Sequence, residues 1–233
     1  MKNIVILTGA GISAESGIKT FRDSDGLWEN HKVTDVATPE AWQRDQELVL
    51  KFYNERRKQI RKAQPNNAHI ALVELEKAFN VYIVTQNIDD LHERAGSSKV
   101  MHLHGEINQS RSSIDAKLVY KMTHHEIKIG ELCELKSQLR PNIVWFGEDV
   151  PMIESAIPLM LQADVVIIIG TSLQVYPAAG LLDFVTQTTT IYNIDPNSVM
   201  ESNDNNLIII KQKAGVAVPN LVKQLLKDIQ IRK

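Results

Sequence analysis

The first residues suited to chemistry form a glycine-rich segment that directly follows a short apolar run. The run is Ile4–Leu7, and Gly9, Ala10 and Gly11 come next. Glycine lets the backbone approach a pyrophosphate closely, and the amides at the start of a following helix point toward negative charge. The next glycine is Gly17, so the spacing departs from G-x-G-x-x-G, and a tight turn also uses glycine. By spacing alone, a phosphate-binding loop and a plain turn both stay open.

Amide and carboxylate side chains follow the apolar run at residues 81–85. They belong to the segment Gln86, Asn87, Ile88 and Asp89. At a strand terminus, such groups suit a site that orders a ribose and a carboxamide. Asn87 or Asp89 could also cap the helix that follows, and the two roles are compatible.

Two histidines, His102 and His104, lie two positions apart. A histidine has a pKa near neutrality, so beside a ribose it can act as general base on a hydroxyl. The alternative is a structural histidine, and in an extended segment both would share one face, so alternation cannot choose between them. Zinc binding by these two with His124 and His125 matches no standard ligand spacing.

Small and polar residues also follow two later apolar runs, at residues 165–169 and 190–194. They are Gly170, Thr171, Ser172, Asn193 and Asp195. They could be simple loops, or they could contact the adenosine half of a dinucleotide. Their repeated placement after strands favours the ligand interpretation.

Short apolar runs alternate with amphipathic stretches along the chain. The runs typical of doubly buried strands are Ile4–Leu7, Val81–Thr85, Ile143–Phe146, Val165–Gly170, Thr190–Ile194 and Leu207–Ile210. The stretches with helical spacing are Ala68–Ala78, Met152–Ala163, Ala178–Gln187 and Val218–Lys227. This alternation predicts an α/β fold with a doubly wound, parallel Rossmann-like sheet that binds ligands at the carboxyl ends of its strands.

Two segments interrupt the alternation. Residues 31–64 are helical and polar, and residues 106–140 are polar and weakly patterned. We expect both to form a small inserted module beside the ligand-binding edge of the sheet. Residues 1–30, 65–105 and 141–233 would then make up the Rossmann-like domain.

Composition excludes several classes of protein. The 43% hydrophobic and 23% charged residues are those of a globular protein, and the formal net charge of −2 gives no case for nucleic-acid binding. No apolar run approaches the ~20 residues that span a bilayer. The only cysteine is Cys133, which excludes intrachain disulfides and a tetrathiolate zinc site. We expect a cytoplasmic protein without a signal peptide.

Taken together, the motifs closely resemble the sirtuins, the NAD-dependent protein-lysine deacylases. The motifs that carry the resemblance are Gly9-Ala10-Gly11-Ile12-Ser13 with Phe21-Arg22, Thr85-Gln86-Asn87-Ile88-Asp89, His104-Gly105, Arg140-Pro141 with Phe146-Gly147-Glu148, and Gly170-Thr171-Ser172 with Val175-Tyr176-Pro177-Ala178. The resemblance runs from Asn3 to about Lys227 and implies NAD as a co-substrate. Acyl-lysine proteins or peptides would be the other substrate.

The resemblance also implies roles for individual residues. The residues that would hold the phosphates and adenosine are Gly9, Ala10, Gly11, Phe21, Arg22, Gly170, Thr171, Ser172, Asn193 and Asp195. Those at the nicotinamide half would be Gln86 on the ribose and Asn87, Ile88 and Asp89 around the carboxamide. His104 would be the general base, with Asn87 as a second catalytic group. Those that would contact an extended peptide, by strand addition, are Val144, Phe146, Gly147, Glu148 and Val175.

In the chemistry that the resemblance implies, the acyl oxygen attacks the ribose C1′ as nicotinamide leaves. His104 then takes a proton from the ribose hydroxyls, so that the 2′ oxygen attacks the acyl carbon. Water completes the release of free lysine and 2′-O-acyl-ADP-ribose. No metal takes part in these steps.

Tyr53 and Arg56 resemble the pair that binds an acyl carboxylate in the bacterial-type sirtuins that remove succinyl or malonyl groups. Positions i and i+3 share a helix face, and a guanidinium beside a phenol is a sound carboxylate receptor. The alternative is a surface arginine in a basic helix with Arg57, Lys58 and Arg61. We expect desuccinylase or demalonylase activity, with deacetylation as a slower activity.

The positions of the family's zinc ligands carry other residues here. By spacing from His104-Gly105 and Arg140-Pro141, they are Ser112, Asp115, Cys133 and Lys136. Because these cannot form a tetrathiolate, we expect no zinc. A substitute apolar mini-core is expected from Ile114, Leu118, Val119, Ile127, Ile129 and Leu132.

Two other functions would use the same pocket. An NAD glycohydrolase or ADP-ribosyltransferase would pass the ribosyl group to water or to a protein side chain, but it needs neither Tyr53 nor Arg56. A silent module that binds NAD or acyl-lysine would be expected to lack the base, yet His104 is present.

Overall fold

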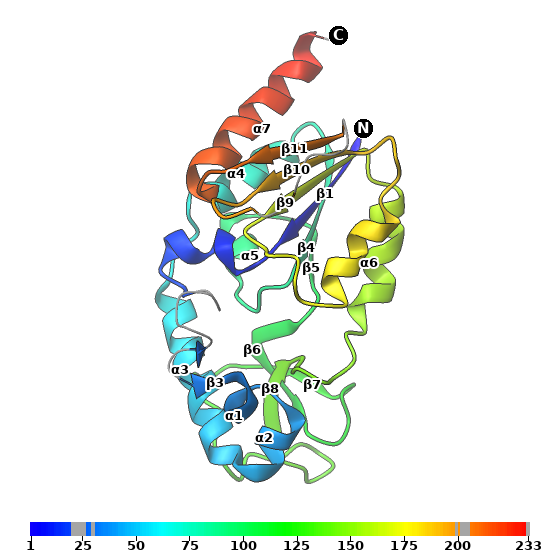
Figure 1. Ribbon diagram of the computed structural model, residues 1–233. Helices are drawn as coiled ribbons and strands as arrows, with labels where there is room; N and C mark the ends of the chain where they lie inside the picture. The colour runs from blue at the N-terminus through cyan, green and yellow to red at the C-terminus, as the bar shows by residue number, and fades with distance from the viewer. Residues whose placement is uncertain (20–26, 29–30, 199, 201–205, 232–233) are drawn as a thin grey trace.

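The computed structural model describes residues 1–19, 27–28, 31–198, 200 and 206–231. Its centre is a six-stranded parallel sheet with the order β11-β10-β9-β1-β4-β5 (Figure 1). The strands are β1 (Asn3–Thr8), β4 (Asn80–Thr85), β5 (Val100–His102), β9 (Val165–Ile169), β10 (Thr190–Ile194) and β11 (Leu207–Ile210). The chain runs outward from β1 through β4 to β5, then returns to the other side of β1. This confirms the doubly wound α/β fold.

Helices cover both faces of this sheet. The helices on one face are α4 (Asn67–Leu75) and α7 (Ala214–Ile231), with the short α5 (Leu91–Ala95) packed on α4. The other face carries α6 (Met152–Leu161) and a 3-10 helix, η3 (Ala178–Phe184). Alternate side chains of β1 join the two cores, since Ile4 and Ile6 face α4 and α7, whereas Val5 and Leu7 face α6. Burial on both faces explains why the strand is uniformly apolar.

The segments at residues 31–64 and 106–140 form elements of their own, below the sheet in Figure 1. The first segment, with residues just before it, contains β2 (Leu27–Trp28), β3 (His31–Lys32), α1 (Val33–Val36), α2 (Pro39–Arg44) and α3 (Gln46–Lys62). The second supplies most of a three-stranded antiparallel sheet of β6 (Gly105–Ser112), β7 (Val119–Lys121) and β8 (Leu139–Ile143). The proposed division between a Rossmann-like domain and a small module stays a prediction, and its boundary at residue 140 falls within β8.

Polar side chains set where the helices of this region begin. The Thr38 hydroxyl accepts a hydrogen bond from Ala41 N (3.1 Å), and the Asp45 carboxylate accepts one from Leu48 N (2.9 Å). Each satisfies an amide that has no partner within its own helix. The apolar face of α3 then packs against Trp42 of α2 and Trp145 after β8. The core of this region therefore combines aliphatic side chains with four aromatic ones, from Trp42, Phe52, Tyr53 and Trp145.

Three predicted elements differ from the structure. Ile143–Phe146 is not a strand of the parallel sheet, because the chain pairs earlier, as β8, and antiparallel to β6. A short apolar run cannot by itself distinguish these two kinds of strand. The glycine segment continues into two single-turn 3-10 helices, η1 (Ala10–Ile12) and η2 (Ala14–Ser16), rather than an α-helix. Likewise, the helix expected at residues 178–187 is the 3-10 helix η3.

The expected apolar mini-core is wrong. Ile114, Val119, Ile129 and Leu132 are all exposed, and only Ile127 of the expected set is deeply buried. Their small sheet has too few covering elements to bury side chains on both faces. The loop at residues 124–131, which follows β7, is held instead by polar groups, most of them on α3.

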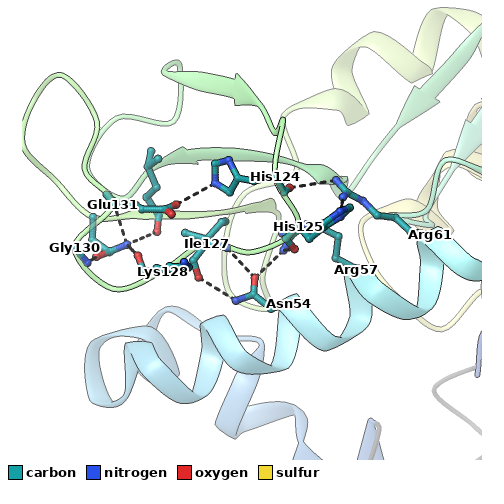
Figure 2. A network of polar contacts seen from close by, with 11 residues as sticks. Asn54, Arg57, Arg61, His124, His125, Ile127, Lys128, Gly130 and Glu131 are labelled. Carbon is teal, nitrogen blue, oxygen red and sulfur yellow. Dashed lines mark hydrogen bonds and ion pairs between the residues drawn. The ribbon is translucent and has the colours of Figure 1, made fainter.

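Figure 2 shows this polar network between α3 and the loop at residues 124–131. Asn54 donates to Ile127 O (2.9 Å) and accepts from Ile127 N (3.0 Å). The buried Arg57 donates to Asn54 Oδ1 (2.8 Å) and, through Nε, to Ile107 O of β6 (2.7 Å). Arg61 donates to His124 O (3.3 Å) and to the His125 ring. Three residues of one helix thus fix the main chain of the loop.

No helix among the described residues is both long and apolar enough to cross a bilayer. The cytoplasmic location stays a prediction.

Candidate active site

The glycine loop after β1 and the turn after β9 meet at the carboxyl edge of the sheet. Gly9 N donates to Ile169 O (3.0 Å), and Gly11 N donates to Gly170 O (2.9 Å). A Cβ added to Gly11 would lie 2.6 Å from Gly170 Cα, so the two backbones touch where no side chain fits. The glycines are needed for this contact between loops, whatever they also do for a phosphate.

A pocket opens beside this contact, between the ends of β9 and β10. It is lined by Thr171, Ser172, Leu173, Asn193, Asp195, Asn197, Ser198 and Met200. Asp195 accepts a hydrogen bond from Asn197 N (2.7 Å). Asn193 Oδ1 is buried and has no hydrogen-bond partner among the described residues. A buried acceptor without a donor is costly, so this oxygen fits a ligand that brings a hydroxyl or amino group, such as an adenosine.

Asn87 and Asp89 lie at the end of β4, behind the glycine loop. Asn87 Nδ2 donates to Gly9 O (3.2 Å) and to Ser13 Oγ (3.2 Å). The Ser13 hydroxyl donates in turn to Asp89 Oδ2 (3.0 Å), and Asp89 Oδ1 accepts from Leu91 N (3.2 Å). All three polar side chains are buried, and burial raises the pKa of Asp89 although its hydrogen bonds oppose the shift. The cluster is a small, preorganised set of amide, hydroxyl and carboxyl groups.

The structure bears on only one of the two roles expected for this segment. Asp89 Oδ1 accepts from Leu91 N, the first residue of α5, although the N-cap position itself is Asp90. The role in binding a ribose and a carboxamide stays a prediction. Gln86, one residue before Asn87, donates from Nε2 to Thr171 Oγ1 (3.0 Å) and so connects β4 to the pocket of β9 and β10. Ile88 is partly buried, and its carbonyl accepts from Ile107 N (2.9 Å).

His104 lies in the turn between β5 and β6, with its ring against Gln86. His104 Nδ1 lies 3.0 Å from Gln86 O, and because a carbonyl only accepts, Nδ1 carries the proton. Nε2 is then the nitrogen with a lone pair. Burial lowers the pKa of His104, although the carbonyl partly opposes this, so the ring is neutral at neutral pH. A neutral imidazole with a fixed tautomer is suited to accept a proton.

Glycine is required directly after this histidine. Gly105 has φ +82, and a Cβ there would lie 2.0 Å from Asn142 O. The turn at Gly105 therefore gives His102 and His104 different surroundings. The alternation of side chains along an extended segment could not distinguish them. His102 ends β5 and contacts Asn87 O and Glu93, whereas His104 contacts Gln86 O.

Tyr53 and Arg56 are both buried on α3, 0% and 4% exposed. Trp145 Nε1 donates to the Tyr53 hydroxyl (3.0 Å), and Arg56 Nη1 donates to Gln59 Oε1 (3.4 Å). Burial also raises the pKa of Tyr53, so the phenol stays protonated. The alternative of a surface arginine is wrong for Arg56, because an exposed basic face would leave it in water.

One short segment connects these two parts of the site. Val144 N donates to His104 O (2.9 Å), and the next residue, Trp145, donates to Tyr53. The candidate base and the candidate carboxylate receptor are therefore held by neighbouring residues of the same stretch.

Comparison with known proteins agrees with this geometry. Residues 9–177, more than half of the chain, match the Sir2 family. The chain belongs to the Sir2 family. It is 53% identical over 227 residues to a protein of Helicobacter pylori named NAD-dependent protein deacylase, and the match covers 97% of this chain and 99% of that protein.

Solved structures of the Sir2 family show the same fold. A Sir2 homologue mutant in complex with ADP ribose superposes with a TM-score of 0.90 at 39% identity, over 98% of this chain and 94% of that one. Another, in complex with 2′-O-acetyl ADP ribose, has a TM-score of 0.87 at 39% identity and covers 97% and 93%.

The segment expected to bind peptide in this Sir2 protein is partly exposed. Phe146 is 45% exposed and Gly147 has φ +90, while Val144 and Val175 are partly buried. The Glu148 carboxylate points inward and accepts from Arg140 (2.6 Å), Arg111 (3.0 Å) and Trp145 N (2.8 Å). Glu148 thus holds the loop in shape, and its direct contact with a peptide stays a prediction.

The positions of the family's zinc ligands form hydrogen bonds here. Ser112 Oγ accepts from Ile114 N and Asp115 N (both 3.2 Å) and lies 2.8 Å from Ser137 Oγ. Ser137 Oγ in turn lies 3.2 Å from Cys133 Sγ. In the part of the chain that the structure describes, no three His, Cys, Asp or Glu side chains gather as a metal site would require.

Sequence reasoning missed Ser13 as a site residue, although it stands in the glycine motif. Its burial and its two bonds, to Asn87 and Asp89, were not readable from spacing. Ser137 was missed in the same way. Phe21 and Arg22, expected to contact the cofactor, lie outside the described residues.

Proposed function

We propose that this protein removes negatively charged acyl groups, succinyl or malonyl, from lysine side chains, with deacetylation as a slower activity. This is the specific form of the NAD-dependent protein deacylase activity to which its family and its relatives point. The observation that carries the acidic preference is the buried pair Tyr53 and Arg56, tied to the His104 turn through Val144 and Trp145.

The physical argument concerns the chemistry of a buried guanidinium beside a phenol. Arg56 is 4% exposed and lies one helical turn from Tyr53. A guanidinium shielded from water binds a carboxylate at the end of an acyl chain strongly, because its fork of N–H donors gives two charge-assisted hydrogen bonds. The protonated phenol of Tyr53, whose oxygen accepts from Trp145, donates one more hydrogen bond to the carboxylate. An acetyl group offers neither charge nor oxygen at that distance.

Each part of the site then has a role. The pocket between β9 and β10 holds the adenosine, the glycine loop holds the phosphates, and Asn87, Ile88 and Asp89 hold the nicotinamide carboxamide. When bound, NAD supplies a ribose carbon that takes the acyl oxygen as nicotinamide leaves. His104 Nε2 accepts the proton of a ribose hydroxyl, which makes that oxygen a nucleophile toward the acyl carbon. Gln86, whose carbonyl holds the His104 ring, contacts this ribose, and Asn87 is the second catalytic group.

We also propose that the protein works without bound zinc. Ser112, Asp115 and Lys136 stand where three thiolates would be needed, and neither a hydroxyl, a carboxylate nor an ammonium can replace the set. Ser112 and Ser137 instead satisfy the main chain and the Cys133 thiol by hydrogen bonding.

The test compares matched succinyl-lysine and acetyl-lysine peptides by mass spectrometry, with and without NAD. We expect NAD-dependent conversion that favours succinyl and yields acyl-ADP-ribose. Arg56→Met should lower kcat/KM for the succinyl peptide by about 10- to 100-fold, because a bidentate ion pair is lost, and that for the acetyl peptide by less than about threefold.

The matched control is Lys58→Met, which removes one positive charge from the exposed side of the same helix and should change neither rate. An equal loss on both peptides in Arg56→Met would refute the carboxylate receptor. Nicotinamide release with neither peptide changed would point instead to an NAD glycohydrolase or ADP-ribosyltransferase.

A further inference from the structure

His102 makes two hydrogen bonds that the reaction described above does not use. Its Nδ1 lies 2.9 Å from Asn87 O, and its Nε2 lies 2.8 Å from Glu93 Oε1. The His102 side chain is 8% exposed, whereas that of Glu93, on α5, is 40% exposed. The ring thus bridges a pocket residue and a carboxylate at the surface.

The two partners determine the charge of the ring. A carbonyl oxygen and an ionised carboxylate only accept hydrogen bonds, so both ring nitrogens must donate, and a histidine that donates twice is an imidazolium. Burial opposes this charge, but the bond and charge of Glu93 and the Asn87 carbonyl outweigh it and raise the pKa of His102. Burial would raise the pKa of Glu93 as well, yet its contact with His102 leaves that pKa lowered. The pair is therefore ionic.

Asn87 is fixed at three points, and His102 holds the third. Its backbone N–H donates to Thr85 Oγ1 (3.0 Å), and its side chain donates to Gly9 O and Ser13 Oγ. Its carbonyl is held only by the His102 ring among the hydrogen bonds of the described residues. That carbonyl belongs to the peptide unit between Asn87 and Ile88, so a rotation there would displace Ile88 and Asp89 as well.

We infer that His102 and Glu93 are positioning residues, an ion pair behind the carboxamide pocket that fixes the peptide unit between Asn87 and Ile88 by donation from the His102 ring. This inference rests on the proposal that Asn87, Ile88 and Asp89 hold the nicotinamide carboxamide. Because the pair contacts Asn87, whereas the segment expected to bind peptide contacts His104 through Val144 N, we expect the pair to act on NAD and nicotinamide rather than on the acyl-lysine substrate.

The device depends on pH through the charge on His102. The charged groups that face it are Glu93 and Asp89 near α5 and Glu106 at the start of β6, and the nearby His92 is kept neutral by its burial. A raised pKa means that the imidazolium is complete at low pH and is lost as pH rises through that raised value. The hydrogen bond from the His102 ring to the Asn87 carbonyl weakens as the pH rises. KM for NAD should therefore rise at alkaline pH.

The experiment measures KM for NAD, KM for the peptide and inhibition by nicotinamide between pH 6 and 9. In Glu93→Gln the side-chain oxygen still accepts a hydrogen bond but the charge is gone, so the rise in KM for NAD should begin at lower pH than in the wild type. Near pH 8.5 we expect about a tenfold higher KM for NAD and weaker nicotinamide inhibition, as when one hydrogen bond to a charged group is lost. Near pH 6 the variant should match the wild type within about twofold, because acid restores the imidazolium. KM for the peptide should not change.

Two further variants make the result decisive. Glu74→Gln removes a carboxylate from an exposed ion pair with Lys77 on the other side of α4 and should leave both profiles unchanged. His102→Asn should raise KM for NAD at every pH and abolish the alkaline dependence. A Glu93→Gln profile that matches the wild type would overturn the positioning role.

Asp89→Asn tests the underlying pocket. If it leaves KM for NAD and nicotinamide inhibition unchanged, then the carboxamide assignment fails. If it raises KM while Glu93→Gln does not, only the positioning role fails.

Discussion

The proposed carboxamide pocket, made of Asn87, Ile88 and Asp89, and the loop at residues 112–137 are both held by hydrogen bonds, but the bonds have different origins. In the pocket, Asn87 and Asp89 follow a buried parallel strand, and their partners are the main chain of the glycine loop and the enclosed Ser13 hydroxyl. In the loop, the partners are the Asn54 and Arg61 side chains on α3 and two serine hydroxyls. The geometry of the pocket is therefore set by sheet register, and that of the loop by a few replaceable side chains.

The two regions also differ in how deeply their side chains are buried. The polar side chains of the pocket are enclosed, whereas several apolar side chains of the loop, among them Ile114 and Ile129, face solvent. Local opening costs least where few apolar contacts are made and where hydrogen bonds are exposed. We therefore expect the two regions to respond separately to substitution, with changes in the pocket affecting chemistry and changes in the loop affecting stability.

The largest effect is expected from His104→Ala. Loss of the general base should lower deacylation by at least ~100-fold in the mass-spectrometric assay, because proton transfer typically contributes that much or more. The melting temperature should stay close to that of the wild type, since among the described residues the His104 side chain makes one hydrogen bond, to Gln86 O. Because burial lowers the pKa of His104, the acid limb of the wild-type pH profile should fall below the pKa of free histidine.

The matched control for this variant is His124→Ala, on the exposed loop, which should keep full activity. Substantial activity in His104→Ala would refute the assignment of the base. A large drop in melting temperature would instead mean that the His104 side chain also stabilises the fold, so that substitutions in the pocket do not affect chemistry alone.

Arg57→Met should produce the largest loss of stability in the small antiparallel region. The buried guanidinium donates to Ile107 O and Asn54 Oδ1, so its removal leaves acceptors without donors, at a cost of about 2–4 kcal/mol in the free energy of unfolding. Hydrogen exchange should accelerate at residues 124–131 and stay slow in β1 and β4. The measurement combines denaturant unfolding with exchange mass spectrometry.

The control for this variant is Lys51→Met, because Lys51 is exposed on the same helix and its loss should leave unfolding unchanged. Equal acceleration of exchange in β1 would show that the loop and the sheet unfold as one unit, which contradicts the comparison.

The sequence predicted the parallel sheet well, because strands buried on both faces are uniformly apolar and few other structures need that pattern. Five of the six predicted strands lie in the parallel sheet. The short β5 was not among them, since Val100–His102 has no apolar run of its own. Ile143–Phe146 was misplaced because this run, which begins at the end of β8, is apolar for another reason: Ile143 and Trp145 pack against α3.

The candidate site was predictable only in its residue types. The motifs identified His104 and Asn87, and their spacing from the predicted strands indicated the edge of the sheet at the carboxyl ends of the strands, where the structure also has them. Spacing could not reveal Ser13 as a link or Glu148 as an inward-facing carboxylate, because each depends on contacts between residues far apart in the chain. The prediction of an apolar mini-core was wrong because apolar composition does not show whether another element covers the side chains.

The smallest effect is expected from treatment with a metal chelator. A chelator such as EDTA should change neither the activity nor the melting temperature, and purified protein should hold far less than one zinc per chain by elemental analysis. Ser112→Ala should instead lower the free energy of unfolding by about 1–2 kcal/mol, because this buried hydroxyl accepts from Ile114 N and Asp115 N. A melting temperature that falls with chelator and recovers with zinc would show that a metal holds the loop. Hydrogen bonds alone would then be too weak to fix a loop whose apolar side chains face solvent.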